Sequence, residues 1–229
     1  MNTQRWRSWG AIALMAVLAG TTRGDHADGP PAPPIPLFDG RTLAGWKSIP
    51  GSMVGTVAIN DGSLILGTGR PMTGVTTTRT DLPTANYQLS FEAKRTEGND
   101  FFAAATFPVG PSFVTLVNGG WGGSVTGLSL INGESAAENQ TNRFVQYRND
   151  VWYRFEVQVT AEIIRCRVDG SEVVLFAHEG AQLKTRLETR VNEPLGFSCY
   201  RSSGAIRQVE IRPLTPAQIA ELHAKIKAD

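Results

Sequence analysis

Residues 151–170 read VWYRFEVQVTAEIIRCRVDG, and apolar side chains alternate with polar ones through most of this stretch. A period of two residues is typical of a β-strand with one buried face and one face in water. The stretch ends at Asp169-Gly170, a dipeptide that favours the tight turn of a β-hairpin because both residues tolerate positive φ. The pattern therefore predicts strands on both sides of this turn.

The same signals recur along the rest of the chain. Alternation returns over residues 87–94, and a second Asp-Gly turn stands at residues 61–62 between two short apolar runs. Further strands are predicted at residues 101–107, 112–118, 124–131, 144–147, 172–177, 195–200 and 205–214. Many short strands without βαβ alternation predict an all-β jelly-roll sandwich of two antiparallel sheets over residues 37–214.

A single helix is predicted at the C-terminal end, within residues 215–229. Thr215 can cap its first turn, Pro216 suits the first helical position, and Gln218 completes a capping box. Ile219, Leu222 and Ile226 then form a narrow apolar stripe, so we expect the helix to pack on the sandwich.

The N-terminal residues have the composition of a targeting segment. Two arginines precede an apolar run at residues 10–20, and small residues follow, which predicts a signal peptide over residues 1–24. The run is too short for a membrane span, which needs about 20 apolar residues. Residues 25–36 are rich in proline and predict an extended tether. We therefore expect a secreted or periplasmic protein without an integral membrane span.

The composition excludes several classes of function. Lys and Arg total 22 and Asp and Glu 21, and this balance argues against a nucleic-acid partner, which needs a concentrated positive field. Three histidines and two cysteines are too few for a typical zinc cluster, and we predict no cofactor. Cys166 and Cys199 both fall in predicted strands, where they either form a disulfide or stay buried and unpaired. The oligomeric state is left open.

Five blocks of sequence carry a resemblance to a known family. They are LFDGRTLAGWK at 37–47, AINDGSLIL at 58–66, YQLSFEAKRTEGND at 87–100, WYRFEVQVTAEIIRCRVDGSEV at 152–173 and GFSCYRSSGAIRQVEIRPL at 196–214. Together and in this order they resemble the 3-keto-disaccharide hydrolase-like domain family. The resemblance implies a concanavalin A-like jelly roll and the cleavage of glycosides whose sugar carries a ketone at C3. The ketone acidifies the proton at C2, so a general base can remove it while the glycosidic oxygen leaves, and water is then added back.

The resemblance also implies a set of catalytic positions. It puts Glu92 on the concave face, where a ligand would lie. Enzymatic members commonly carry a Gln-x-x-His sequence in the next-to-last strand block, whereas this chain has Ser198 and Tyr200 there. Tyr200 and the following Arg201 are the candidates to donate a proton and to polarise a carbonyl group.

Three further segments supply candidate substrate-binding residues. Asn99 and Asp100 end the hairpin that follows the strand at residues 87–94. The segment NGGWGG at 118–123 contains Asn118 and brackets Trp121 with glycines, and an indole face can stack on a sugar ring. The polar loop at 132–141 holds the remaining candidates, Glu134, Glu138 and Asn139. Two carboxylates in that loop are also a weak Ca²⁺ candidate, although no Asp-rich calcium loop is present.

These observations leave three hypotheses for the function. The first is an exported carbohydrate-active hydrolase that cleaves 3-keto-glycosides by elimination and hydration. The second is a lectin-like module that binds a glycan without cleaving it, through Trp121 and Glu138. The third is a structural domain of the cell envelope displayed on its proline-rich tether.

Overall fold

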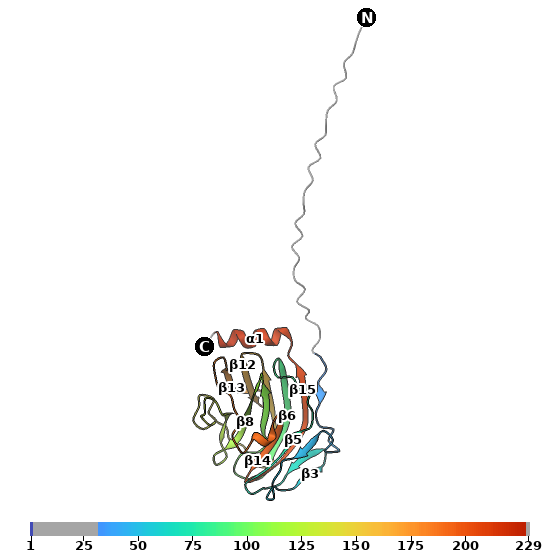
Figure 1. Cartoon of the computed structure of the whole chain (residues 1–229), viewed down its shortest axis with the longest axis vertical. Helices are drawn as coiled ribbons and strands as arrows, with labels where there is room; N and C mark the ends of the chain where they lie inside the picture. The colour runs from blue at the N-terminus through green and yellow to red at the C-terminus, as the bar shows by residue number, and fades with distance from the viewer. Residues whose placement is uncertain (2–31, 228–229) are drawn as a thin grey trace.

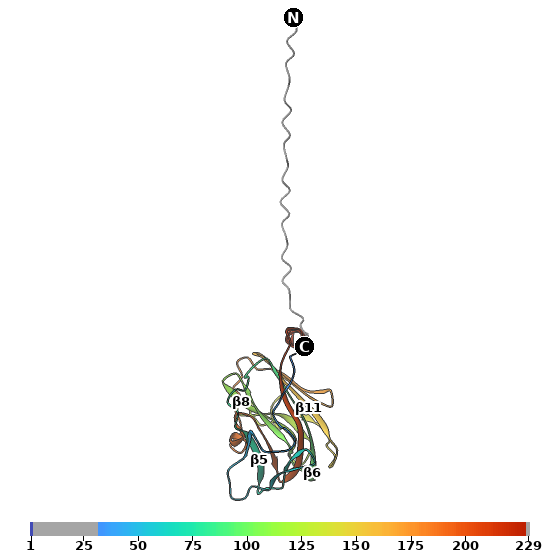
Figure 2. The same cartoon turned by 90° about the vertical axis from the view of Figure 1, so that its right-hand side faces the viewer.

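The computed structural model describes Met1 and residues 32–227, which fold into a sandwich of two antiparallel sheets (Figure 1). The signal peptide predicted at residues 1–24, and the tether as far as residue 31, lie outside the described residues. In Figure 2, β5 and β8 of one sheet lie on the opposite side of the molecule from β6 and β11 of the other. The predicted jelly-roll sandwich is confirmed.

Eight strands form the first sheet. Their order is β13 (Ser171–Ala177), β12 (Ile163–Val168), β11 (Tyr153–Val159), β6 (Tyr87–Gly98), β15 (Ser202–Pro213), β4 (Ser63–Leu66) and β3 (Val57–Asn60), and β1 (Ile35–Pro36) also pairs with β15. The register pairs Phe91 with Phe155 and Leu89 with Val157, so the apolar sides of β6 and β11 coincide. The alternating polar residues, Glu92 among them, therefore face away from the core.

Seven strands form the second sheet. Their order is β10 (Arg143–Phe144), β9 (Val125–Ser129), β8 (Ser112–Gly120), β7 (Ala104–Val109), β14 (Gly196–Tyr200), β5 (Met72–Thr77) and β2 (Trp46–Ser48). Val75, Phe107 and Phe197 belong to the core between the sheets. Their strand neighbours alternate to the other side of this sheet, which we call the distal face.

Aromatic rings fill the centre of the core. Phe91 and Phe155 stack with centroids 4.9 Å apart, and Phe197 of the other sheet meets Phe91 edge-on at 4.9 Å. The indole nitrogen of Trp46 donates to the carbonyl oxygen of Leu37 at 2.7 Å. This bond ties the LFDG segment to the second sheet.

The two cysteines are free and buried, so the disulfide alternative is not what the structure shows. Cys166 lies on β12 of the first sheet and Cys199 on β14 of the second. Burial raises the pKa of both thiols, for Cys199 to about 12. Both therefore remain protonated, inert parts of the core.

Two predicted strands are shortened in the structure for identifiable reasons. The strand predicted at residues 101–107 begins at Ala104, because Ala103 has a φ of 45° that interrupts extended backbone. The strand predicted at 144–147 is reduced to Arg143–Phe144. Tyr147 instead turns into the core, where its ring packs edge-on against Phe102 at 5.1 Å.

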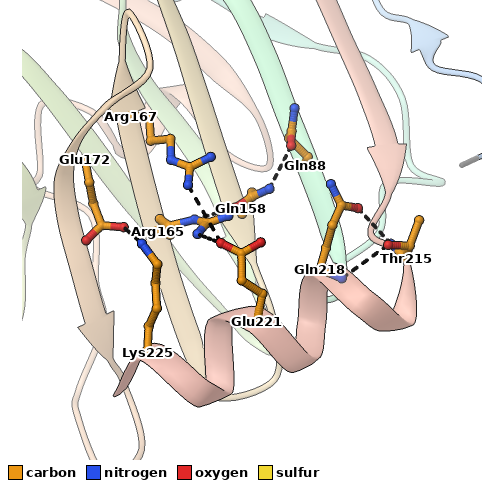
Figure 3. A network of polar contacts seen from close by, with 9 residues as sticks. All are labelled: Gln88, Gln158, Arg165, Arg167, Glu172, Thr215, Gln218, Glu221 and Lys225. Atoms are coloured by element: carbon orange, nitrogen blue, oxygen red, sulfur yellow. Dashed lines mark hydrogen bonds and ion pairs between the residues drawn. The ribbon is translucent and has the colours of Figure 1, made fainter. Parts of the chain in front are cut away.

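The C-terminal helix α1 (Pro216–Ile226) forms as predicted, with both hydrogen bonds of the Thr215–Gln218 capping box present. Its apolar stripe packs on Ile163 and Leu214, and the helix covers one end of the first sheet (Figure 1). Beneath it, the buried Arg165 donates to Gln158 Oε1 at 2.6 Å and to Glu221 Oε1 at 2.9 Å (Figure 3). Of the described part of the chain, no helix has the length and apolarity to cross a membrane.

Candidate functional site

A pocket of about 210 Å³ opens on the distal face of the seven-stranded sheet. Its walls come from β8, β9, β14, the connection between β6 and β7, the turn between β8 and β9, and the long segment 178–195 between β13 and β14. Ten residues line it: Asp100, Phe101, Thr115, Val117, Trp121, Ser129, Arg186, Glu188, Thr189 and Tyr200.

Hydroxyl groups lie along the strands under the pocket. Thr115 Oγ1 is within 2.9 Å of Thr106 Oγ1 and donates to Thr189 Oγ1 at 3.1 Å. Ser129 is fully buried, and its Oγ has no hydrogen-bond partner among the described residues. A buried hydroxyl without a partner is unfavourable, and this one belongs to a residue that lines the pocket.

Aromatic side chains form the apolar wall of the pocket. The rings of Phe101 and Tyr200 lie 5.4 Å apart, and the Tyr200 backbone N–H donates to the Phe101 carbonyl oxygen. Trp121 stays 45% exposed at the turn between β8 and β9. Its φ of 49° is left-handed, an uncommon state for a bulky residue that is often found at ligand sites.

The backbone N–H and the backbone carbonyl oxygen of Asp100 are both hydrogen-bonded. Its N–H donates to Ser202 Oγ at 2.9 Å, and its carbonyl oxygen accepts from Ser202 Oγ at 3.1 Å and from Arg95 Nη1 at 3.3 Å. One carboxylate oxygen, Oδ1, accepts from the Phe101 N–H at 2.7 Å. These bonds fix the direction of the carboxylate before any ligand arrives.

The Arg95 side chain is buried in the sandwich, because Arg95 follows Phe91 and Ala93 in the buried alternation of β6. Its guanidinium reaches the pocket residue Asp100 from inside the molecule. Besides the Asp100 carbonyl oxygen, it donates to Asn149 Oδ1 at 2.6 Å and to the Tyr147 carbonyl oxygen at 2.9 Å. All three acceptors are neutral, and burial lowers the pKa of this guanidinium. A buried cation without a paired carboxylate contributes a positive potential behind Asp100.

Segment 178–195 covers part of the distal face. Asn192 anchors it by donating to the carbonyl oxygens of Val75 and Phe197. The close approach requires Gly74, where a Cβ atom would lie 3.0 Å from Asn192 Nδ2. The segment brings Arg186 and Glu188 to the pocket, and the Glu188 backbone N–H, together with Arg186, lowers the pKa of the Glu188 carboxyl.

The structure brings three of the predicted residues together and separates the others. Asp100, Trp121 and Tyr200 line one pocket. Glu92 lies on the other sheet, facing away from the core, where it accepts from Arg207 Nε at 2.8 Å. Glu92 and Tyr200 therefore lie on different sheets of the sandwich. Arg201 borders a neighbouring shallow recess, with its guanidinium 5.5 Å from the Tyr200 ring centroid.

The other predicted binding residues stand outside the pocket lining. Asn118 is buried and donates to the Ala103 carbonyl oxygen, and Asn99 is exposed beside the pocket residue Asp100. In the loop 132–141, Asn139 is buried, and its side-chain amide donates to the backbone carbonyl oxygens of Leu128, Glu134 and Ser135. Glu134 is exposed, and Glu138 is bound by the hydroxyl and N–H of Ser135, bonds that lower the pKa of Glu138.

Sequence reasoning missed Arg186, Glu188 and Ser129. The first two come from an 18-residue stretch without strand periodicity, and such a length is itself a sign of a functional loop in a compact domain. Ser129 has the strand phase of a distal-face residue, but nothing in the sequence reveals that its hydroxyl lacks a partner. Across residues 32–227, no group of three or more His, Cys, Asp or Glu side chains is arranged to hold a metal ion.

Solved structures of carbohydrate-related proteins are among those to which the chain is similar. The Crh5 transglycosylase in complex with NAG aligns with a TM-score of 0.51 and 11% identity over 82% of this chain and 90% of that one. The carbohydrate binding module CBM66 from Bacillus subtilis gives 0.46 and 9% over 73% and 95%. Domain 4 of AbnA, a GH43 extracellular arabinanase from Geobacillus stearothermophilus, in complex with arabinotriose, gives 0.46 and 13% over 77% and 87%.

The sequence comparisons are more specific than the structural ones. No curated protein sequence matches the chain. A family model, however, matches residues 33–212, which cover both sheets of the sandwich and every residue that lines the pocket. The chain therefore belongs to the family of the 3-keto-alpha-glucoside-1,2-lyase-like domain.

Proposed function

We propose that the pocket binds the sugar ring of a 3-keto-glycoside and that Asp100 removes the proton at C2. The observation that carries this proposal is the fixed carboxylate of Asp100 on the wall of a pocket that also offers a free hydroxyl and an exposed indole. At 210 Å³ the pocket is smaller than the roughly 300–1,000 Å³ of sites for drug-sized ligands, which suits a single ring.

Position favours Asp100 over the other carboxylates considered. Glu188 is paired within the pocket with Arg186, whose Nε lies 3.5 Å from Glu188 Oε2. Glu92 is on the other sheet and paired with Arg207. Asp100 lines the pocket, and its backbone is clamped by Ser202 and Arg95.

Two further residues complete the reaction. The Arg186 guanidinium polarises the C3 carbonyl oxygen and stabilises the enolate that forms when Asp100 takes the C2 proton. The enolate then expels the glycosidic oxygen: the C1–O bond breaks, C1=C2 forms, and the departing oxygen takes the phenol proton of Tyr200. Water adds across C1=C2 to release the free 3-keto sugar, and the Asp100 proton returns to Tyr200 through solvent.

The signal peptide predicted at residues 1–24 makes export of the protein part of the same proposal.

The test is turnover of methyl 3-keto-α-glucoside by the purified protein, followed as methanol release. Asp100→Asn should lower kcat by about 10²–10⁴, the range for loss of a general base, and Tyr200→Phe should lower it less, because water can replace the acid. Glu92→Gln is the matched control and should keep wild-type turnover. An inactive wild-type protein, or an Asp100→Asn variant as active as the wild type, would contradict the proposal.

A second candidate function is glycan binding without cleavage. It is favoured by Ser198, which stands near the family's histidine position and is buried, with no hydrogen-bond partner for its Oγ in the described part of the chain. In that case the wild-type protein would bind sugars that it does not cleave, and Trp121→Ala would abolish the binding seen on a glycan array.

A further inference from the structure

A second recess continues from the pocket along the same face of the sheet. This groove, of about 400 Å³, runs between the loop 49–54 and the segment 187–191. Its lining includes Pro50, Met53, Pro71, Met72, Leu187 and Val191. Leu187 and Met53 are 77% and 62% exposed, so the groove has an apolar lining open to solvent.

Two observations join the groove to the pocket. Glu188 borders both of them. Met72 of β5, in the groove, is also the direct cross-strand partner of Tyr200 of β14, in the pocket. Directly opposed residues place their Cβ atoms about 4.5–5.5 Å apart on one face, so the groove begins beside the Tyr200 side chain.

The chemistry of the groove differs from that of the pocket. No aromatic ring occurs among its described lining residues, whereas the pocket offers Phe101, Trp121 and Tyr200. A second sugar ring would need hydroxyl partners and an aromatic face to stack on. The groove instead offers mainly aliphatic side chains, with its charged groups, Arg70 and Glu188, beside them. A lining of this kind is complementary to an apolar group, because the contact removes apolar surface of both from water.

We propose that the groove binds the leaving group of the substrate, and that this leaving group is an apolar alcohol, alkyl or aryl, rather than a second sugar. The inference rests on the proposed function, because it places the 3-keto ring in the pocket. Tyr200 then stands at the junction, where it meets the glycosidic oxygen that joins the two parts.

The experiment compares n-alkyl 3-keto-α-glucosides, from methyl to hexyl, with the full-length protein. Their leaving alcohols are chemically alike, so differences in kcat/KM report the contacts of the chain. We expect kcat/KM to rise by up to about fourfold per methylene buried. The ratio of hexyl to methyl kcat/KM should fall in Met53→Ser and Leu187→Ser. Phe144→Ser is the matched control, because Phe144 is 79% exposed on the edge strand β10 outside the groove, and it should keep the wild-type ratio.

A series that stays flat from methyl to hexyl would overturn the proposal, and so would groove variants with the wild-type ratio. A 3-keto-disaccharide that outperforms the hexyl substrate would overturn it in favour of a second sugar. If the protein turns over no 3-keto-glycoside, the proposed function fails, and calorimetry with unoxidised alkyl glucosides tests the groove alone. Tighter binding of hexyl than of methyl glucoside would then support the groove as an apolar subsite, and equal binding would overturn it.

Discussion

Two regions of this molecule each bury an arginine, and they satisfy it in different ways. Beneath α1, Arg165 is bound by Gln158 and by the Glu221 carboxylate, and Gln158 is bound in turn to Gln88 (Figure 3). Behind the pocket, Arg95 meets neutral oxygens, and the nearby pocket keeps a buried hydroxyl without a partner at Ser129. The first region is completed by the chain itself. The second leaves a buried hydroxyl without a partner among the described residues, and it is there that we propose a polar ligand binds.

The largest effect is expected on kcat, when Arg95, the arginine behind the pocket, is substituted. Arg95→Lys loses the guanidinium geometry that bonds the Asp100 carbonyl oxygen through Nη1 while holding Asn149 and Tyr147, so we expect kcat to fall by about 10²-fold, the size of effect that a small misplacement of a catalytic group can have. KM should change much less, because Arg95 does not line the pocket. Arg165→Lys is the matched control and should leave kcat unchanged. Steady-state kinetics with methyl 3-keto-α-glucoside measure both, and equal losses in the two variants would refute the positioning role.

Removing the arginine beneath α1 should act on stability instead. Arg165→Ala leaves the buried Gln158 side chain without its donor, so we expect the free energy of unfolding to fall by about 1–3 kcal/mol. Urea denaturation measures it, and activity should remain at the wild-type level at temperatures where the variant is folded. A variant that loses activity while its unfolding curve is unchanged would show that the contacts of Arg165 beneath α1 affect the pocket directly.

A substitution at Ser129, whose hydroxyl is unpaired, should have a smaller effect. It should not lower the stability of the ligand-free protein, but it should lower the affinity for a ligand. Ser129→Ala removes a buried group that has no partner, so the ligand-free protein should be as stable as the wild type or more stable by about 1 kcal/mol. Ligand affinity should fall by about 5–10-fold, the value of one neutral hydrogen bond. Thermal unfolding with and without ligand reads both quantities. Thr115→Ala, which breaks bonds to Thr106 and Thr189, is the control and should destabilise the ligand-free protein.

The smallest effect concerns acid stability. The hydrogen bond from Arg165, with its charge and that of Arg167, lowers the pKa of Glu221 below the ordinary value of 4.5. A lowered pKa in the folded state stabilises the fold above pH 4.5 and loses this contribution as the pH falls through the folded value. Because Glu221 is half exposed, the effect is about 1 kcal/mol or less. The melting temperatures of the wild type and Glu221→Gln should differ at pH 7, and the difference should shrink as the pH falls below 4.5; a difference that stays constant would contradict the assignment.

The fold could be predicted from the sequence because its signals are local. Alternation over residues 87–94 and the two Asp-Gly turns each depend on neighbouring residues, and the capping residues Thr215 and Gln218 do so as well. The strand predicted at 144–147 is shorter in the structure because Tyr147 packs in the core against Phe102, which is far away in the sequence.

The site could be predicted only in part, because the pocket is assembled by tertiary contacts. Asp100, Trp121 and Tyr200 stood out as unusual residues at strand ends and turns. Glu92 was placed by resemblance, although its phase on β6 is that of the polar face. On the same strand, Arg95 occupies a position that the alternation predicts to be buried, and a charged residue at such a position indicates a special environment that we overlooked. Glu188 reaches the pocket through a segment that docks by Asn192 and Thr189, which no local pattern reveals.

We propose Asp100 as the base that removes the C2 proton of a sugar held in the pocket. The most direct measurement is proton NMR of methyl 3-keto-α-glucoside in D₂O, because it follows exchange and consumption of the C2 proton apart from later steps. We predict rapid loss of the C2 signal with the wild type and with Glu92→Gln, and loss slower by about 10²–10⁴ with Asp100→Asn. Loss of the signal with Asp100→Asn as fast as with the wild type would contradict the assignment of the base.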